Sequence, residues 1–294
     1  MTAIEVQRLH KSYGENEAVR GIDFEVRRGE VFGLLGPNGA GKTTTVEILE
    51  GYRTRSSGHV AVLGHDPARR DPDLRARVGI VLQSSGIYQY LTVRESVAHW
   101  AGFYPAPRDV DEVVGIVGLE EAAEQRANQL SGGQKRRLDL ALALVGDPEL
   151  VFLDEPTTGF DPAARRNAWD TVRSLRDLGK TVLLTTHYLD EAQALADRVA
   201  IIKDGRILAE GPPASLGAGS GRYLVSYRAG DGPRTHETDD PTALLHELTA
   251  AALARGERLE DLSVTRPSLE EVYLELTAEA RGGAGDEPPG RGRI

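Results

Sequence analysis

Hydrophobic and polar residues alternate with a period of two in much of the first third of the chain, and that period predicts β-strands. Strands are expected at residues 4–9, 19–26, 31–35, 59–63 and 78–82. In the second of these segments, Ile22, Phe24 and Val26 alternate with charged residues. One face of this strand is therefore expected to contact water, which is typical of an antiparallel sheet.

Later strands have a different pattern. Residues 150–153 and 181–185 are short, continuous apolar runs, each close to a helical pattern. Such runs are typical of parallel strands that are covered on both faces. A hairpin is expected from residues 199–202 and 206–209, because the pair Asp204-Gly205 between them favours a two-residue turn.

The segment from about 84 to 147 changes to a helical period and predicts a helical insertion. Thr92 is a candidate N-cap, with Glu95 three residues later as its capping-box partner. The most apolar stretch, residues 138–153, is interrupted by Asp139, Asp147 and Glu149, so no membrane span is expected. The first ten residues alternate like a strand and have no basic flank before an apolar core, so secretion is not expected either.

Breaker residues indicate where domains end. Residues 211–222 are rich in glycine and proline and are the best candidate for a linker. We expect an α/β domain over residues 1–216, with a mixed sheet, an antiparallel β subdomain and the helical insertion. A small α+β accessory region is expected at 217–280. Residues 281–294 have no apolar period, and disorder is expected there.

Composition limits the possible chemistry. The 294 residues contain no cysteine, which rules out disulfides, iron–sulfur clusters and thiolate zinc sites and fits a cytosolic protein. With 35 basic and 45 acidic residues, the net charge is −10, which argues against a broad nucleic-acid surface. Apart from His187, discussed below, the histidines show no paired ligand spacing, so we expect no metal site made by protein ligands alone.

A phosphate-binding loop follows the strand at residues 31–35. It matches the pattern G-x-x-x-x-G-K-[ST] between a strand and a helix, with the residues Gly36, Pro37, Asn38, Gly39, Ala40, Gly41, Lys42, Thr43 and Thr44. The glycines let successive N–H groups face inward, and the helix that follows directs its positive end at the anion. Lys42 is expected to reach the β- and γ-phosphates, and Thr43 to bind Mg²⁺ through its hydroxyl.

Two acids follow the apolar strand at residues 150–153. The carboxyl ends of strands are where open α/β sheets bind ligands. Asp154 is therefore the candidate on the metal side, acting through water. Glu155 is the candidate general base for the water that attacks the γ-phosphate.

The sequence Leu130-Ser-Gly-Gly-Gln134 resembles, without a change, the signature motif of the ATP-binding cassette (ABC) ATPases. Ser131, Gly132, Gly133 and Gln134 stand at the start of a helical stretch and can form a second anion-binding helix end. In that family, this end contacts the γ-phosphate of ATP held by the other subunit. The resemblance therefore implies ATP and Mg²⁺ as cofactors and a dimer, with a homodimer favoured.

Further positions match the family in order. Tyr13 corresponds to the aromatic residue that stacks on adenine, and Gln83 to the glutamine that contacts magnesium. His187 corresponds to the histidine that contacts the γ-phosphate. Gly159-Phe160-Asp161 corresponds to the loop that crosses the dimer interface, with phenylalanine where the family usually has leucine.

Within this family, the sequence resembles the drug and antibiotic exporter branch of the daunorubicin-resistance type. The resemblance rests on the segments Leu91-Thr-Val-Arg-Glu95, Arg136-Arg-Leu-Asp-Leu-Ala141, Thr185-Thr-His-Tyr-Leu-Asp-Glu191 and Pro267-Ser-Leu-Glu-Glu-Val-Tyr-Leu-Glu-Leu-Thr277. In the last phrase, Leu269, Val272, Tyr273 and Leu276 form one helix face, for which core packing is expected. The resemblance implies a separately encoded transmembrane permease, with the chain peripheral on the cytoplasmic face of the membrane. The alternatives are a lipid or polysaccharide exporter and an ATP-dependent regulator without a transport role.

Overall fold

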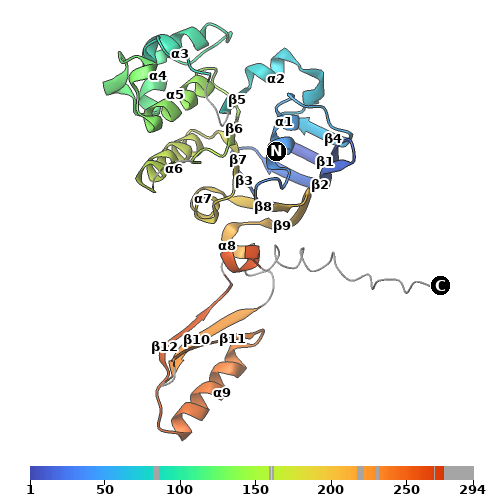
Figure 1. The fold of residues 1–294 in the computed structure, drawn as a ribbon, viewed down its shortest axis with the longest axis vertical. Coiled ribbons are helices and arrows are strands. Elements are labelled where there is room, and N and C mark those ends of the chain that lie inside the picture. The colour runs from blue at the N-terminus through green and yellow to red at the C-terminus, as the bar shows by residue number, and fades with distance from the viewer. Residues whose placement is uncertain are drawn as a thin grey trace, which may run out of the picture. The chain divides into compact units, whose positions relative to one another are not determined.

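The structure, a computed structural model, describes residues 1–81, 86–158, 160, 162–216, 222–229, 232–267 and 269–274. It contains two units, Met1–Gly211 and Pro212–Ile294, each taken by itself below (Figure 1). The strands of the first unit are β1 (Thr2–Tyr13), β2 (Asn16–Arg27), β3 (Val31–Leu35), β4 (Ser57–Val62), β5 (Val78–Val81), β6 (Leu150–Asp154), β7 (Thr181–Thr186), β8 (Arg198–Lys203) and β9 (Arg206–Gly211). Its helices are α1 (Lys42–Leu49), α2 (Pro72–Ala76), α3 (Val93–Ala101), α4 (Val110–Ile116), α5 (Gly132–Leu144), α6 (Pro162–Asp177) and α7 (Leu189–Leu195), with short 3₁₀ turns at Pro67–Arg69, Glu120–Ala122 and Ala127–Gln129.

The first unit contains two sheets. The larger has the strand order β5-β6-β7-β3-β8-β9, in which the first five strands are parallel and β9 is antiparallel to β8. The smaller sheet, β2-β1-β4, is antiparallel throughout. Both strand arrangements confirm the predictions from the period of the sequence. The parallel arrangement places the carboxyl ends of β3, β6 and β7 at one edge, where ligands of such sheets bind.

The predicted turn signals are also confirmed. Asp204 and Gly205 both have positive φ, 49° and 75°, as a two-residue hairpin turn between right-twisted strands requires. At the start of α3, the Thr92 side chain accepts from the Glu95 backbone N–H, while the Glu95 carboxylate accepts from the Thr92 N–H. These local signals determine where the β8–β9 hairpin turns and where α3 begins.

The two faces of the larger sheet pack against different partners. One face contributes Val31, Val151 and Val182 to a core shared with α5, α6 and α7. The other face contributes Phe32 and Phe152 to a core shared with α1 and the antiparallel sheet. Adjacent residues of a strand point to opposite faces, so a strand buried on both sides must be apolar throughout.

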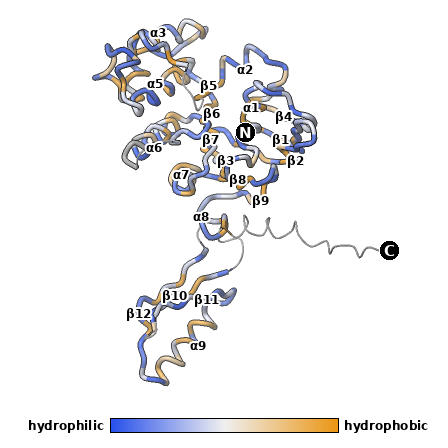
Figure 2. The backbone as a smooth tube through the Cα atoms, in the orientation of Figure 1, coloured by the Kyte–Doolittle hydropathy of each residue, from blue (hydrophilic) through white to orange (hydrophobic). Residues whose placement is uncertain are grey.

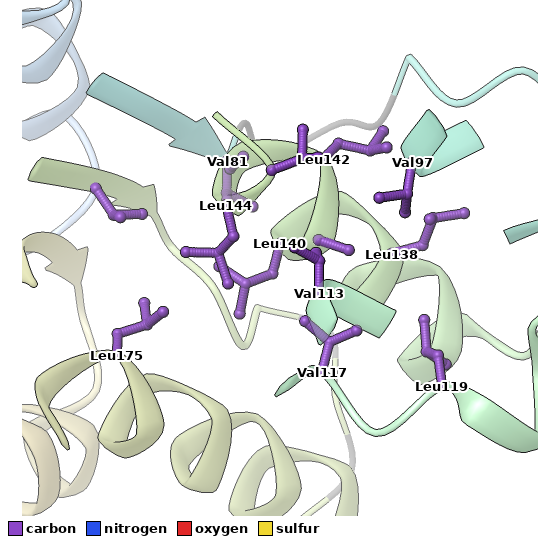
Figure 3. Close-up of a cluster of buried hydrophobic side chains, with 14 of the residues drawn as sticks. Val81, Val97, Val113, Val117, Leu119, Leu138, Leu140, Leu142, Leu144 and Leu175 are labelled. Atoms are coloured by element: carbon purple, nitrogen blue, oxygen red, sulfur yellow. The ribbon is translucent and has the colours of Figure 1, made fainter. Parts of the chain in front are cut away.

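The helical insertion contributes to the core that the larger sheet shares with α5, α6 and α7. Four leucines of α5 pack there with a valine of α3, a valine of α4 and the valine that follows α4, as Figure 3 shows: Leu138, Leu140, Leu142, Leu144, Val97, Val113 and Val117. Each of these side chains is at most 7% exposed. Because this core continues onto Val81 of β5, the insertion is anchored to the sheet.

The second unit begins within the predicted linker, five residues before the expected boundary at residue 216. Its elements are α8 (Pro213–Leu216), β10 (Tyr223–Ala229), β11 (Gly232–Thr238), α9 (Pro241–Ala254) and β12 (Glu260–Thr265), followed by a helical segment at 269–274. The strands pair antiparallel in the order β11-β10-β12. Hydrophobic residues recur along α9 (Figure 2). The predicted helix near the chain end is found, with Leu269 and Val272 buried, whereas Leu276 and the tail at 281–294 lie outside the described residues.

In the part of the chain that the structure describes, we found no helix with the length and apolar character needed to cross a bilayer.

Candidate nucleotide-binding site

The glycine-rich loop between β3 and α1 is packed too closely against neighbouring strands for side chains at two positions. A Cβ atom at Gly36 would lie 2.1 Å from the carbonyl oxygen of Ile202 in β8. A Cβ atom at Gly41 would lie 2.5 Å from the carbonyl oxygen of Ala18 in β2, and Gly41 also has a φ of 103°. Lys42 then begins α1, as the sequence predicts.

The lysine of this loop is buried and points back along the loop. Its side chain is 4% exposed, and Nζ donates to the carbonyl oxygens of Gly36 at 2.8 Å and Pro37 at 3.1 Å. Nζ also lies 3.3 Å from Oε1 of Glu155. The loop is closed by hydrogen bonds from Ala40 N–H to the Pro37 carbonyl and from Gly36 N–H to the carbonyl of Thr186.

A pocket of about 320 Å³ opens at this loop. Its lining combines one residue of β2, the loop, the first residues of α1 and the acid after β6: Ala18, Asn38, Gly39, Gly41, Lys42, Thr43, Thr44 and Glu155. The first N–H groups of a helix have no intrahelical partner and carry the positive end of its dipole. Together with the ammonium of Lys42, they make the pocket suited to phosphate.

The two predicted acids at the end of β6 share one neighbour on β7. Asp154 pairs in parallel register with Thr185, whose hydroxyl donates to Asp154 Oδ1 at 2.5 Å. The same hydroxyl accepts from the Glu155 N–H at 3.0 Å. Glu155 has a φ of 45°, a left-handed conformation that is uncommon for a residue with a side chain. Thr185 therefore joins the two acids and fixes the point at which the chain turns.

The carboxylate of Glu155 lies among three polar groups. The Thr158 hydroxyl donates to Oε2 at 3.0 Å, while Oε1 lies 3.3 Å from Lys42 Nζ and 3.4 Å from His187 Nδ1. Burial raises the pKa of Glu155, but the Thr158 hydrogen bond and the charges of Lys42 and His187 lower it more, so that the net pKa lies below its usual value. The carboxylate is therefore ionised at neutral pH and can accept a proton from a bound water.

Close to this site, the pKa of a second carboxyl group, that of Glu50, is shifted in the opposite direction. Burial raises the pKa of Glu50, at the end of α1, to about 8, with additional contributions from the negative charges of Asp154 and Glu47. At neutral pH, Glu50 is therefore largely protonated. The sequence contained no signal for this, since the shift depends on burial next to another acid.

The residues of the predicted signature motif cap a helix. Ser131 is the N-cap of α5, and its hydroxyl accepts from Gln134 N–H at 3.2 Å, while the Gln134 side chain accepts from Ser131 N–H at 2.8 Å. An added Cβ atom would meet nothing within 4 Å at Gly132 or at Gly133. The four residues do not line the pocket at Lys42 of the same chain.

The remaining predicted site residues differ in how close they lie to the pocket. His187 follows β7 and lies beside Glu155, as given above, with its ring centroid 4.1 Å from that of Tyr188. Tyr13 ends β1 and is 41% exposed, next to the cations of Lys11 and Arg53, and it does not line the pocket. Gln83 lies outside the described residues, as do Gly159 and Asp161 of the predicted interface loop.

Three contacts of the site were not predicted from the sequence. Thr158 and Thr185 hold the two acids, as described. In addition, Arg136 of α5 donates to the carbonyl oxygens of Asp154 at 3.3 Å and Pro156 at 3.2 Å. A hydroxyl three residues after an acid is a local signal that could have indicated Thr158. Thr185 and Arg136 depend on strand register and helix packing.

Comparison with known proteins places the chain among nucleotide-binding subunits. The sequence signature described as ABC transporter matches residues 19–158. The chain is 38% identical to the daunorubicin resistance ATP-binding protein DrrA3 of Streptomyces coeruleorubidus, over 95% of this chain and 97% of that protein. It is 40% identical to the Nod factor export ATP-binding protein I of Paraburkholderia xenovorans strain LB400, over 94% and 97%.

Among solved structures, the chain resembles the ATP-binding cassette MJ0796 in a dimeric, post-hydrolysis state bound to ADP and Pi. The TM-score is 0.63 at 26% sequence identity, and the match covers 71% of this chain and 98% of that one.

Proposed function

Because the chain belongs to the ABC transporter family and is an ATP-hydrolysing subunit of it, we propose that it powers export of a drug, antibiotic or other hydrophobic compound through a separate transmembrane permease. The observation that carries this proposal is the contact of Glu155 with Lys42 and His187, of which Lys42 and Glu155 line the pocket at the glycine-rich loop. A relative named for daunorubicin resistance supports the drug as cargo.

In this proposal, the backbone and the pocket residues hold the phosphates of ATP. Lys42 contacts the β- and γ-phosphates as a point charge, and Glu155 takes a proton from the attacking water. His187, beside Glu155, contacts the γ-phosphate. Tyr13 stacks on adenine, which requires it to exchange its contacts with Lys11 and Arg53 for the base.

The donor set also fits a magnesium ion. Mg²⁺ binds through oxygen ligands, commonly one or two carboxylates together with substrate phosphates and waters. Thr43 offers an exposed hydroxyl at the pocket, and Asp154 has a carboxylate held by Thr185. Among the described residues, no group of three or more histidines or acids could hold a metal alone, which fits an ion that is bound with the nucleotide. We assign Thr43, Asp154 and Gln83 to this ion, which would neutralise phosphate charge.

A dimer accounts for the signature motif. Ser131, Gly132 and Gly133 lie at a helix N-terminus, away from the pocket of their own chain. In the part of the chain that the structure describes, an added Cβ atom at Gly132 or Gly133 would contact no other atom. We propose that this end approaches the γ-phosphate bound by a second subunit, which favours a homodimer. The dimeric state of the similar cassette supports this arrangement.

An aromatic groove supports docking of a membrane subunit. A pocket of about 370 Å³ is lined by apolar and aromatic residues of the helical insertion, of β5 and of the segment after α1, among them Tyr52, Ile80, Ile87, Trp100 and Tyr104. Exposed aromatic surface of this kind marks protein interaction sites. We propose that the permease docks here, which places the chain on the cytoplasmic face of the membrane.

Co-expression tests this function. A sensitive host is given the chain alone, a candidate permease alone, or both, and drug efflux is measured with co-purification of the two proteins. We expect efflux and a stable complex only with both, and neither with a Lys42→Ala chain. Export by this chain alone, or full efflux with Lys42→Ala, would contradict the proposal.

A second class of cargo, lipid or polysaccharide, is supported by another relative. The relative named for Nod factor export is 40% identical to this chain, similar to the relative named for drug resistance. A lipid or polysaccharide cargo is therefore the second candidate. The same efflux experiment with labelled lipid and oligosaccharide decides between the two classes. A regulator without a transport role is the third candidate, and it predicts no co-purifying permease.

We propose residues 1–216 as the ATPase domain and 217–280 as an accessory region, with no nucleic-acid partner.

A further inference from the structure

Buried polar atoms without a hydrogen-bond partner gather at one place in the described part of the chain. They are Arg165 Nε and Trp169 Nε1 of α6, His187 Nδ1 after β7, and Glu191 Oε2 of α7. Arg165 and Trp169 stand one helical turn apart on α6. Unpaired buried polar atoms lower stability, so we examined the contacts of the residues that carry them.

Glu191 is the most buried member of this cluster. Its side chain is 0% exposed, and Oε1 accepts from the hydroxyl of Thr157 at 2.9 Å. Thr157 is also fully buried. Burial raises the pKa of Glu191, while hydrogen-bonding groups on Thr186, Thr157 and Trp169 and the charge of Arg165 lower it. A buried carboxylate in such a place is a weak source of stability, since its desolvation is unfavourable.

The Thr157 hydroxyl links this carboxylate to the turn that presents Glu155. Within the turn, Thr158 N–H donates to the Glu155 carbonyl at 3.2 Å, and Phe160 N–H donates to the Thr157 carbonyl at 3.1 Å. The Thr158 side chain then holds Oε2 of Glu155. A shift of Thr157 would therefore move the whole turn and the carboxylate on it.

The other end of the link is on the helix that follows His187. Glu191 lies four residues after His187, in α7. Tyr188 N–H donates to the Thr186 hydroxyl at 2.9 Å, a contact that spans His187. The Thr157–Glu191 hydrogen bond thus joins the segment that carries Glu155 to the segment that carries His187. These are the two groups whose side chains lie 3.4 Å apart in the site.

We propose that Thr157 and Glu191 are a positioning pair that fixes the Glu155 carboxylate relative to His187 and Lys42 for ATP hydrolysis. Neither residue touches the nucleotide pocket, so both act through Glu155. The inference rests on the proposed role of Glu155 as general base.

The test compares Thr157→Val with Thr157→Ser in the full chain. Valine keeps the shape of threonine but has no hydroxyl, whereas serine keeps the hydroxyl. Loss of this buried hydrogen bond is expected to lower kcat about tenfold or more in Thr157→Val. Nucleotide affinity should stay within about twofold of wild type, because Lys42 and the loop are unchanged. Thr157→Ser and Glu191→Gln, which keeps an acceptor oxygen, should retain most of kcat.

The comparison of kcat with nucleotide affinity separates positioning from a general loss of structure. A general loss of structure would lower both quantities, whereas displacement of the Glu155 carboxylate should lower kcat alone. Recovery of kcat in Thr157→Ser would assign the effect to the hydroxyl group.

Several outcomes overturn the inference. They are wild-type kcat in Thr157→Val, no recovery of kcat in Thr157→Ser, an equal loss in Glu191→Gln, or a parallel loss of nucleotide affinity. Thr157→Ala replaces Thr157→Val if the valine variant does not fold. Glu155→Gln is measured alongside: if it still hydrolyses ATP, the base assignment fails, whereas an inactive Glu155→Gln with an unaffected Thr157→Val refutes the positioning pair alone.

Discussion

The Nζ atom of Lys42 lies 3.3 Å from Oε1 of Glu155, although the two residues are separated by more than one hundred positions in the sequence. Both side chains are largely buried, 4% and 11% exposed, so each charge contributes to compensating the other. A phosphate that enters the pocket competes with Glu155 for the same ammonium group. Nucleotide binding and release of the candidate base are therefore coupled through one contact.

Removal of the lysine is expected to affect both events. Lys42→Ala should abolish ATP hydrolysis and weaken nucleotide binding about tenfold to a hundredfold, the range for a lost hydrogen bond to a charged partner. Binding is measured with a fluorescent nucleotide and hydrolysis by phosphate release. Lys180→Ala is the matched control, because Lys180 pairs with Asp147 before the amino end of β7, at the opposite edge of the sheet. Wild-type turnover in Lys42→Ala would contradict the assignment of the loop.

Replacement of the candidate base should trap a dimer. Glu155→Gln keeps the shape of the side chain but cannot take a proton, so ATP should bind while hydrolysis nearly stops. Bound ATP would then hold two chains together between one loop and the other chain's α5. Light scattering should show a shift from monomer to dimer with ATP and magnesium and none without nucleotide. A Glu155→Gln chain that binds ATP tightly but stays monomeric would leave the shared site without support.

A second substitution tests the other half of that interface. Ser131 is exposed at the N-cap of α5, and Ser131→Arg would fill the anion-binding end with a bulky side chain. In the Glu155→Gln background, this variant should bind ATP but form no dimer. A dimer of unchanged strength would show that α5 does not contact the partner's nucleotide.

Two glycines should respond in opposite ways to the same added methyl group. Gly36→Ala places Cβ 2.1 Å from the Ile202 carbonyl, and overpacking of this kind lowers stability by about 1–3 kcal/mol. Gly133→Ala meets nothing within 4 Å in the first turn of α5, and alanine favours helix by up to about 1 kcal/mol. Thermal unfolding should show a lower Tm for Gly36→Ala only. ATP-dependent dimerisation should decrease in Gly133→Ala, and an unchanged dimer would argue against close approach there.

Glu50 predicts a pH dependence of stability. Its pKa is raised from 4.5 to about 8, so between these values the folded state keeps a proton that the unfolded state has lost. Stability contributed by this group therefore decreases as pH rises from 4.5 to about 8, with a slope of at most about 1.4 kcal/mol per pH unit. Glu50→Gln removes this effect. The difference in unfolding free energy between Glu50→Gln and wild type should increase over this range and be constant above it; a flat difference would contradict the shift.

The sequence was informative where structure depends on neighbours in the chain. The strand at Val31–Leu35, the start of α1 at Lys42 and the Thr92–Glu95 capping box follow from local patterns, and the structure has them at the predicted positions. The carboxyl-end rule also brought Asp154 to the correct edge of the sheet. Strand order and register are not encoded locally, so the hydroxyl of Thr185 could not be assigned to the two acids.

The sequence also did not predict which polar groups are buried. Thr157 and Glu191 have ordinary polar patterns in the sequence and are fully buried in the structure. The raised pKa of Glu50 likewise depends on the distance to Asp154, which no periodicity predicts. Local motifs therefore predicted where elements begin and end, whereas contacts between distant segments were not predicted.

The backbone of Glu155 has a positive φ, which lowers stability, whereas its side chain is the candidate base for hydrolysis. A left-handed backbone costs a residue with a side chain about 1–2 kcal/mol, and glycine adopts it without that strain. Glycine at position 155 would relieve this backbone strain, but it would also remove the candidate base and leave the buried Lys42 without its carboxylate partner. Engineering of this chain for stability therefore needs a catalytic screen, because one residue combines an uncommon backbone conformation, a buried ion pair and the proposed role in hydrolysis.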